Sequence, residues 1–264
     1  MTNYKNITVD TDLRGVATLT LNRPNKHNAL NKSLISELRN ATAKLGKDKT
    51  VRIVILTGAG ESFCAGGDIN WFADNLKSDR EERIAESMQL AQMLFDLNNL
   101  PKPLIGRING SAYGGGVGMM SVCDITVGID QSNFGLTEVR LGLIPANISP
   151  YVVKRIGSAN ARTVMLSGAL FNGKRALDLG LLTFCTTAKG LNAKIEDIVT
   201  SHLEAAPEAV RETKKLIEHV SSHNVHDNMI YTANKLADIW DTSEGKIGIS
   251  CFLNKHRPPW RSAK

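Results

Sequence analysis

The spacing of hydrophobic positions changes repeatedly along the first 130 residues, and these changes predict strands that alternate with helices. The segment 16–22 (VATLTLN) alternates with a period of two and is rich in β-branched residues. The segment 51–58 (VRIVILTG) is almost continuously apolar, which is typical of a strand covered on both faces. Two further apolar segments, 103–110 and 124–130, also favour strands.

Helical spacing occupies the intervals between these strands. It extends over 31–46, where it ends at Gly46, over about 74–98, where it stops before Pro101, and over 114–123. Strands separated by helices predict an α/β architecture with parallel strands.

Beyond about residue 150 the pattern becomes mainly helical, and no internal repeat or long linker interrupts it. We therefore expect an α/β core over residues 1–195 and a helical region over residues 196–264. The helical segments are 151–157, 158–168, 174–180, 191–206, 207–222, 226–240 and 243–255.

Composition places the 264-residue chain among ordinary globular proteins, with 42% hydrophobic and 22% charged residues. The four cysteines are scattered and the six histidines form no metal-ligand pattern, so we predict buried thiols, no metal and no permanently bound cofactor. The start of the sequence has no apolar leader and no run is long enough to span a membrane. We expect a cytoplasmic protein, or a mitochondrial-matrix protein if a transit peptide has been removed.

Two glycine-bearing turns carry the candidate chemistry. The triplet Gly114–Gly116 lies between an apolar strand and a helical segment, and a second turn, SFCAGGDI at 62–69, follows the strand at 51–58. Glycines allow a ligand to approach backbone N–H groups, and a helix start adds a positive dipole end. Either a phosphate or a developing oxyanion could be bound by such amides, and a pair of them suits an enolate oxygen.

Five segments in order along the chain resemble the crotonase (enoyl-CoA hydratase/isomerase) superfamily: 21–30, 62–69, 108–125, 134–145 and 252–260. The resemblance covers nearly the whole chain, and its look is nearest to hydratases of the methylglutaconyl-CoA type. It implies a spiral of ββα units and an acyl-coenzyme A substrate. It also implies a homotrimer, or a dimer of trimers, that assembles through the C-terminal helices.

The resemblance also implies roles for individual residues. The oxyanion hole maps onto the backbone amides of Ala65 and Gly115, and the catalytic glutamate onto Glu138. An oxyanion-hole donor is typically worth about 3–4 kcal/mol. The coenzyme A grip maps onto two turns, the chain around residue 115 and the C-terminal segment, namely Lys26, Ala29, Ala65, Gly66, Gly67, Asp68, Ile69, Gly115 and Lys255.

One position departs from the hydratase pattern. Hydratases of this superfamily use two glutamates, and the second would stand three residues after Gly115, where this chain has Gly118. Glu138 alone could take a proton from water and return it to carbon. Glu82 and Glu86 are conceivable substitutes, although charges on that helix are better explained as a solvated face.

The loss of one carboxylate leaves three reactions open. We favour hydration of a 2-enoyl-CoA, with Δ3,Δ2-enoyl-CoA isomerisation or decarboxylation by a single glutamate as alternatives. Arg140 and Lys154 could pair with a carboxylate on the acyl group. The depth of the acyl pocket would depend on Trp71, Tyr113, Phe134 and Ile148.

The sequence gives less support to functions of other classes. The net charge of +6 and the basic residues between 32 and 49 could attract RNA, but acidic residues dilute them and there is no aromatic stacking platform. We therefore expect neither a nucleic-acid partner nor a membrane partner. A non-catalytic role is disfavoured because Glu138 is retained beside both turns.

Overall fold

The computed structural model describes residues 4–261, so the first and last three residues of the two expected regions lie outside it. A six-stranded sheet forms its centre, with strand order β1-β2-β3-β4-β6-β9. All neighbours are parallel except β1 and β2. The bounds are β1 Ile7–Thr11, β2 Val16–Leu21, β3 Ile53–Gly58, β4 Leu104–Ile108, β6 Ile125–Ile129 and β9 Phe184–Thr186.

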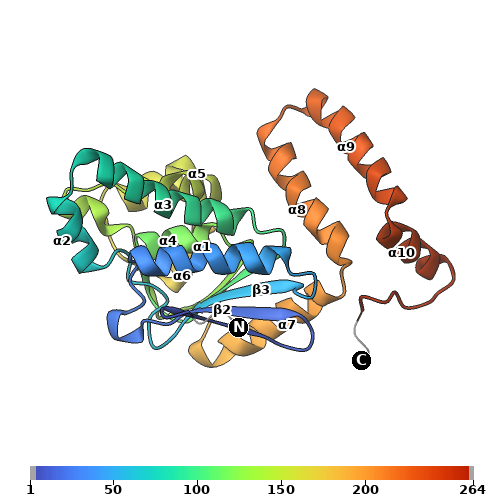
Figure 1. Ribbon diagram of the computed structural model, residues 1–264, viewed down its shortest axis with the longest axis horizontal. Coiled ribbons are helices and arrows are strands. Elements are labelled where there is room, and N and C mark those ends of the chain that lie inside the picture. The colour runs from blue at the N-terminus through green and yellow to red at the C-terminus, as the bar shows by residue number, and fades with distance from the viewer. Residues whose placement is uncertain (1–3, 262–264) are drawn as a thin grey trace.

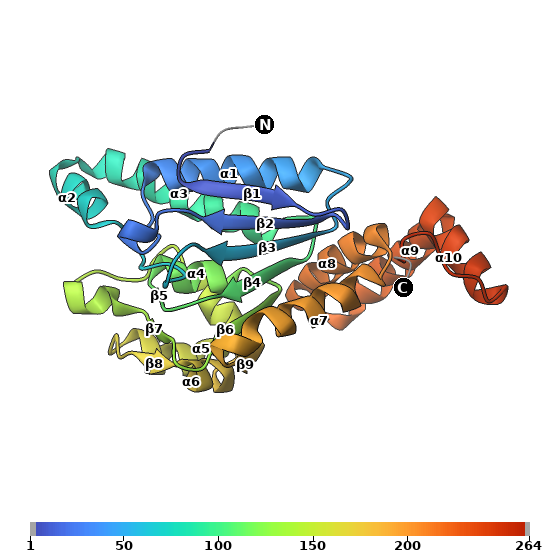
Figure 2. The same cartoon turned by 90° about the horizontal axis from the view of Figure 1, so that it is seen from below.

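Helices cover both faces of this sheet (Figure 2). The helices α1 (Lys32–Lys47), α3 (Arg80–Asn98), α4 (Gly115–Ser121) and α5 (Ser149–Met165) bury apolar side chains against one face. The helix α7 (Leu191–Leu203) buries five against the other. The all-apolar pattern expected of a strand covered on both faces is confirmed for β3, in which all six residues are buried.

A second, three-stranded sheet joins β5 (Ala112–Tyr113), β7 (Asn133–Gly135) and β8 (Phe171–Asn172). Both β8 and β9 lie in the part of the chain that we expected to be helical, so that expectation is corrected there. The short helices are α6 (Gly173–Asp178) and the 3-10 turns η1 (Pro24–Lys26), η2 (Thr137–Leu141) and η3 (Ala188–Gly190).

The expected long helix over 74–98 is two helices, α2 (Ile69–Lys77) and α3. Asp79 ends the continuity because its side chain accepts a hydrogen bond from the Glu82 amide, 2.8 Å away, while the Glu82 carboxylate accepts one from the Asp79 amide. This capping box starts a new helix and turns the chain between the two.

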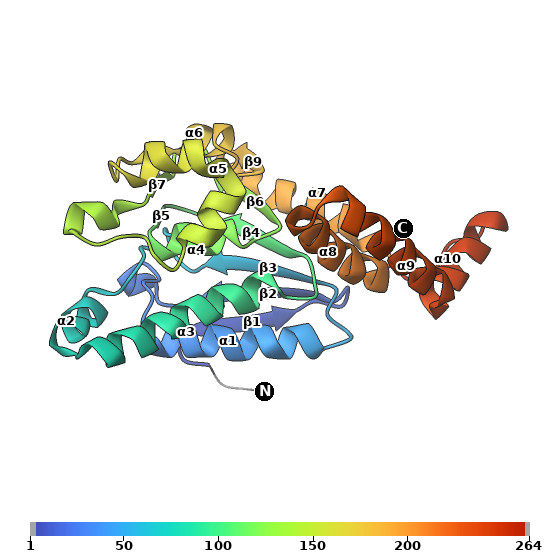
Figure 3. The same ribbon diagram turned by 90° about the horizontal axis from the view of Figure 1, so that it is seen from above.

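The last three helices form an arm that projects from the core (Figures 1 and 3). They are α8 (Pro207–Ser222), α9 (Val225–Asp241) and α10 (Ser243–Leu253), and none has a fully buried residue. The division expected at residue 195 falls inside α7, which packs on the sheet, so the arm begins after Leu203. None of the helices within residues 4–261 has the length and apolar character needed to cross a membrane.

Candidate active site

Backbone pairing brings three turns side by side. In the small sheet, Tyr113 pairs with Gly135, and the Gly114 amide donates to the Gly135 carbonyl oxygen at 2.9 Å. On the other side, the Tyr113 amide donates to the Cys64 carbonyl oxygen at 3.0 Å. The turns at 62–67, 111–116 and 133–138 therefore meet at one edge of the molecule.

The Glu138 carboxyl lies against the middle turn. Gly114 has a φ of 47°, and a Cβ built there would lie 2.7 Å from Glu138 Oε1, so a larger residue would displace the carboxyl. Glu138 Oε2 is buried and has no hydrogen-bond partner among residues 4–261. Burial raises the pKa of Glu138 above its ordinary value. The result is a poorly solvated carboxyl beside the start of α4.

The predicted oxyanion-hole donor Ala65 needs correction. Its amide donates to the His27 carbonyl oxygen at 2.9 Å and is therefore occupied. Within the described part of the chain, the amides of Gly67 and Gly115 have no acceptor. The two turns approach each other closely at Gly66, because a Cβ on it would be 3.0 Å from the Tyr113 carbonyl oxygen and 3.9 Å from the Gly114 α-carbon. The available pair of donors is thus Gly67 and Gly115.

Asp68 holds this turn in place, and its side chain is engaged by other residues of the protein. Its carboxylate accepts hydrogen bonds from Arg23 at 2.8 Å and from the Asn70 amide at 3.0 Å, so it caps α2. The two charged side chains are only 8% and 15% exposed. Burial acts to raise the pKa of Asp68, but the bonds from Arg23 and Asn70 outweigh it and the net pKa is lowered.

The loop at 24–30 lies beside the same turn, since the Leu30 amide donates to the Gly66 carbonyl oxygen at 2.7 Å. Buried Asn28 donates to the carbonyl oxygens of Ala59 and Ser62, each at 2.9 Å. Lys26 is exposed, whereas Ala29 is buried. Ile69, the first residue of α2, is also exposed. The structure therefore brings Lys26, Ala29 and the 65–69 turn together.

Lys255 is not part of this group. It follows α10 by two residues, and α10 lies at the opposite end of the molecule from η1 and α2 (Figure 1). In one protomer it cannot reach the turns, so a role for Lys255 would require a neighbouring subunit.

The position of the absent second glutamate is filled. Gly118 is buried in α4, and a Cβ there would overlap Ile148 Cγ2 and lie 2.8 Å from Ile148 Cβ. Ile148 is 3% exposed, and Leu94 Cδ2 lies on the same side at 3.7 Å. A longer side chain at position 118 is therefore excluded, and an aliphatic surface stands in place of a carboxylate.

The other acidic candidates are engaged elsewhere. Glu82 takes part in the capping box that starts α3. Glu86 was expected on a solvated face, but its side chain is only 18% exposed because it contacts Lys32 and accepts a hydrogen bond from Trp71. Neither residue supplies a second free carboxylate.

The two cations suggested for a substrate carboxylate also have partners. Arg140 Nε donates to the Ser167 carbonyl oxygen at 3.3 Å, and Lys154 pairs with Glu218 on α8 at 2.6 Å. Both side chains are exposed. They would have to release these partners to bind a substrate.

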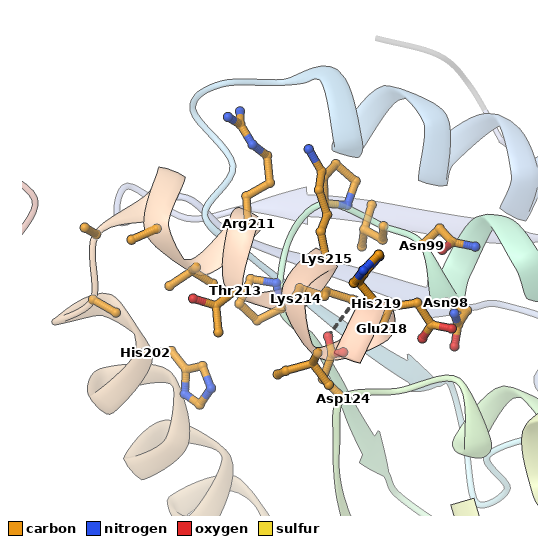
Figure 4. A pocket seen from close by; sticks show the side chains of 18 of the residues that line it. Asn98, Asn99, Asp124, His202, Arg211, Thr213, Lys214, Lys215, Glu218 and His219 are labelled. Atoms are coloured by element: carbon orange, nitrogen blue, oxygen red, sulfur yellow. Dashed lines mark hydrogen bonds and ion pairs between the residues drawn. The ribbon is translucent and has the colours of Figure 1, made fainter. Parts of the chain in front are cut away.

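A separate cavity, shown in Figure 4, is lined by none of the residues at the three turns. It measures about 930 Å³ and lies between α8, the end of α7 and the segment 98–103, with the Lys214–Asp124 ion pair at its wall. None of the candidate site residues lines it. Within residues 4–261 no group of three or more His, Cys, Asp or Glu side chains could hold a metal ion.

Comparison with known proteins gives a consistent result. The family model described as enoyl-CoA hydratase/isomerase matches residues 11–263. The chain is 32% identical to enoyl-CoA hydratase ACTT6 of Alternaria alternata over 90% of its length and 78% of that protein. It superposes on Pseudomonas aeruginosa AtuE with a TM-score of 0.94 and 33% identity, covering 98% of this chain and all of that one. For a Shewanella pealeana enoyl-CoA hydratase the values are 0.93 and 31%, covering 97% and 96%.

Proposed function

The chain belongs to the enoyl-CoA hydratase/isomerase family, and from this membership we propose that it adds water to a 2-enoyl-CoA thioester. One observation carries the proposal. The Glu138 carboxyl, with one buried oxygen that lacks a partner, lies against Gly114, next to the free amide of Gly115. A proton-transfer group and an oxyanion donor thus adjoin each other.

In this reaction the thioester oxygen accepts hydrogen bonds from the amides of Gly67 and Gly115. Water attacks C3 while Glu138 takes a proton from it, and the electrons of the C2–C3 double bond move onto the thioester oxygen. The amides stabilise the resulting enolate because they are already oriented. Glu138 then returns the proton to C2. Its raised pKa suits both halves of the cycle, because it must gain and lose a proton.

A second candidate is Δ3,Δ2-enoyl-CoA isomerisation. It is favoured by the aliphatic surface of Ile148 over Gly118, since a single carboxylate can move a proton from C2 to C4 through the same enolate. Decarboxylation would use the same amides, with the carboxylate lost from the substrate supplying the electrons of the enolate.

For the acyl group we propose a branched 2-enoyl-CoA of the methylglutaconyl type as the first substrate to test. The support is the resemblance of residues 137–157 to such hydratases, together with the aliphatic Ile148 and Leu94 beside Gly118, which would accept an alkyl branch. A substrate carboxylate would compete with Ser167 for Arg140 or with Glu218 for Lys154.

We also propose that coenzyme A lies across the adjacent loops at 24–30 and 65–69, and that the protein is a homotrimer or a dimer of trimers. The arm supports assembly, because large apolar side chains on all three of its helices are exposed, among them Met229, Trp240 and Phe252 at 64%, 55% and 82%. Sedimentation of the purified protein tests this directly: a monomer at micromolar concentration would contradict it.

The activity is tested by separate incubation with crotonyl-CoA, a 3-enoyl-CoA and 3-methylglutaconyl-CoA. A product heavier by one water, with loss of the conjugated enoyl absorbance, identifies a hydratase. Rearrangement of the 3-enoyl-CoA without a change in mass identifies an isomerase. No conversion of any substrate by the assembled protein would reject both candidates.

A further inference from the structure

The turn at 62–67 that carries the Gly67 amide, here called the oxyanion turn, leads directly into the helix α2. Few contacts with the core hold α2 in place. It begins two residues after Gly67, and none of its side chains is fully buried. Ile69 and Leu76 are 82% and 85% exposed. The position of α2, and of the backbone that leads into it, therefore depends on a few specific contacts.

One of these contacts is made by a carboxylate on α3. The indole Nε1 of Trp71 donates to Glu86 Oε2 at 2.6 Å, while the other oxygen of Glu86 contacts Lys32, the first residue of α1. A single side chain thus joins the beginnings of α1 and α2 to α3, at the end of the molecule where all three helices meet (Figure 3).

Both connections lead back to Gly67. Lys32 stands two residues after Leu30, whose amide donates to the Gly66 carbonyl oxygen at 2.7 Å and whose carbonyl oxygen accepts from the Asp68 amide at 2.9 Å. On the α2 side, the ring of Trp71 stacks on that of Phe72, with centroids 6.3 Å apart.

The Phe72 ring in turn lies on Gly67. A Cβ at Gly67 would be 2.6 Å from Phe72 Cζ, so the ring covers the α-carbon that adjoins the free amide. The carboxylate of Glu86 is therefore connected to both flanks of the oxyanion turn, through Trp71 and Phe72 on one side and through Lys32 and Leu30 on the other.

We propose that Glu86 is a positioning residue of the oxyanion hole: by binding Trp71 and Lys32 together it fixes the direction of the Gly67 amide. This inference rests on the proposed function, because it presumes that the Gly67 amide binds the thioester oxygen. Glu86 touches no reacting atom. It acts on the position of the Gly67 amide, where a small displacement lowers the rate strongly, since a shift of about 1 Å can reduce a rate about 100-fold.

Two substitutions and a matched control test the role. Glu86→Gln keeps an acceptor for Trp71 and removes the ion pair with Lys32, whereas Glu86→Leu removes both. Asp96→Asn is the control, because Asp96 also lies on α3 and pairs with a cation of α1, Arg39, at 3.1 Å, two to three turns away from Glu86. We expect kcat to fall about tenfold in Glu86→Gln and about 100-fold in Glu86→Leu, with KM changed less than about threefold, and both constants unchanged in the control.

A spectroscopic measurement separates positioning from general loss of structure. The thioester 4-(dimethylamino)cinnamoyl-CoA absorbs at longer wavelength when its carbonyl accepts strong hydrogen bonds. We expect a long-wavelength shift on binding to the parent protein and to Asp96→Asn, a smaller one with Glu86→Gln and the smallest with Glu86→Leu. Should Glu86→Leu fail to fold, Trp71→Phe takes its place, because it removes the same hydrogen bond.

The outcomes are distinct. An equal shift and equal kcat in the parent protein and the Glu86 variants would overturn the inference and leave the proposed function intact. An equal loss in Asp96→Asn would show that Glu86 acts only through general stability and would also overturn it. Binding to the parent protein without any shift would reject the oxyanion hole itself.

Discussion

The contact between Gly118 and Ile148 predicts that Gly118→Ala destabilises the parent protein but stabilises a variant that lacks the Ile148 side chain. In the parent protein, Gly118→Ala places a methyl group on Ile148 Cγ2 and 2.8 Å from Ile148 Cβ. Both residues are buried, so neither can move into solvent. Overpacking of this kind costs about 3 kcal/mol at the upper end of its range. Alanine regains about 1 kcal/mol of helix propensity, which leaves a net loss of about 2 kcal/mol.

In an Ile148→Gly background the same substitution should stabilise the protein. The new methyl group then meets only Leu94 Cδ2, at an ordinary contact distance of 3.7 Å. The gain in helix propensity of about 1 kcal/mol remains. The coupling between the two positions should therefore be about 3 kcal/mol, at the upper end for residues in direct contact.

The measurement is a double-mutant cycle in urea at one fixed protomer concentration, since assembly would otherwise add to the apparent stability. Equal effects of Gly118→Ala in both backgrounds would refute the packing argument. A positive result allows a further variant, Gly118→Glu with Ile148→Gly, in which a second carboxylate has room.

Four other outcomes follow from the site. Glu138→Gln should reduce turnover by about 10²–10⁴-fold while calorimetry shows unchanged binding of coenzyme A; retained turnover would contradict the proton-transfer role. Because burial raises the folded-state pKa of Glu138, kcat/KM should fall as pH decreases through a pKa above the ordinary 4.5; a limb at or below that value would contradict the burial. For the same reason the ionised form disfavours folding, so Glu138→Gln should be more stable than the parent protein at neutral pH, and thermal melts should show this advantage vanish below about pH 4. Asp68→Asn keeps a capping residue but leaves Arg23 unpaired, and should cost about 3 kcal/mol in urea unfolding; a loss below about 1 kcal/mol would show that the pair is well solvated.

The local pattern of hydrophobic residues was sufficient to predict the longer strands and helices of the core. The strands at 16–22 and 51–58 and the helix at 31–46 were expected from periodicity and are confirmed as β2, β3 and α1. The break between α2 and α3 was missed, although its capping box, Asp79 with Glu82, is visible in the sequence. Residues with high helix propensity on both sides of the break made the segment resemble one continuous helix.

The short strands β8 and β9 had no comparable sequence pattern. They contain two and three residues, and they exist because β7 and β6 offer them hydrogen bonds. Pairing between residues that are distant in sequence overrides local preference in such cases.

The same limit explains the error at the oxyanion turn. Glycine and a helix start indicated the region correctly, but which amide is free depends on its partner across space. His27 occupies the Ala65 amide, and nothing in the order of residues 62–69 reveals this. In the same way, the sequence shows at Gly118 that a carboxylate is missing. That the Ile148 side chain occupies the space of this carboxylate is visible only from the packing of α4 against the start of α5.

Of the three groups assigned to the reaction, two are main-chain amides, and this has an evolutionary consequence. A codon change at Gly67 or Gly115 can displace such a donor, but only proline can delete it. In the proposed reaction, the capacity to stabilise the enolate is thus inherited with the backbone, whereas the fate of that enolate is decided by a few replaceable side chains. A lineage with this scaffold can exchange one reaction for another by changing those side chains, without first losing the costly part of its chemistry.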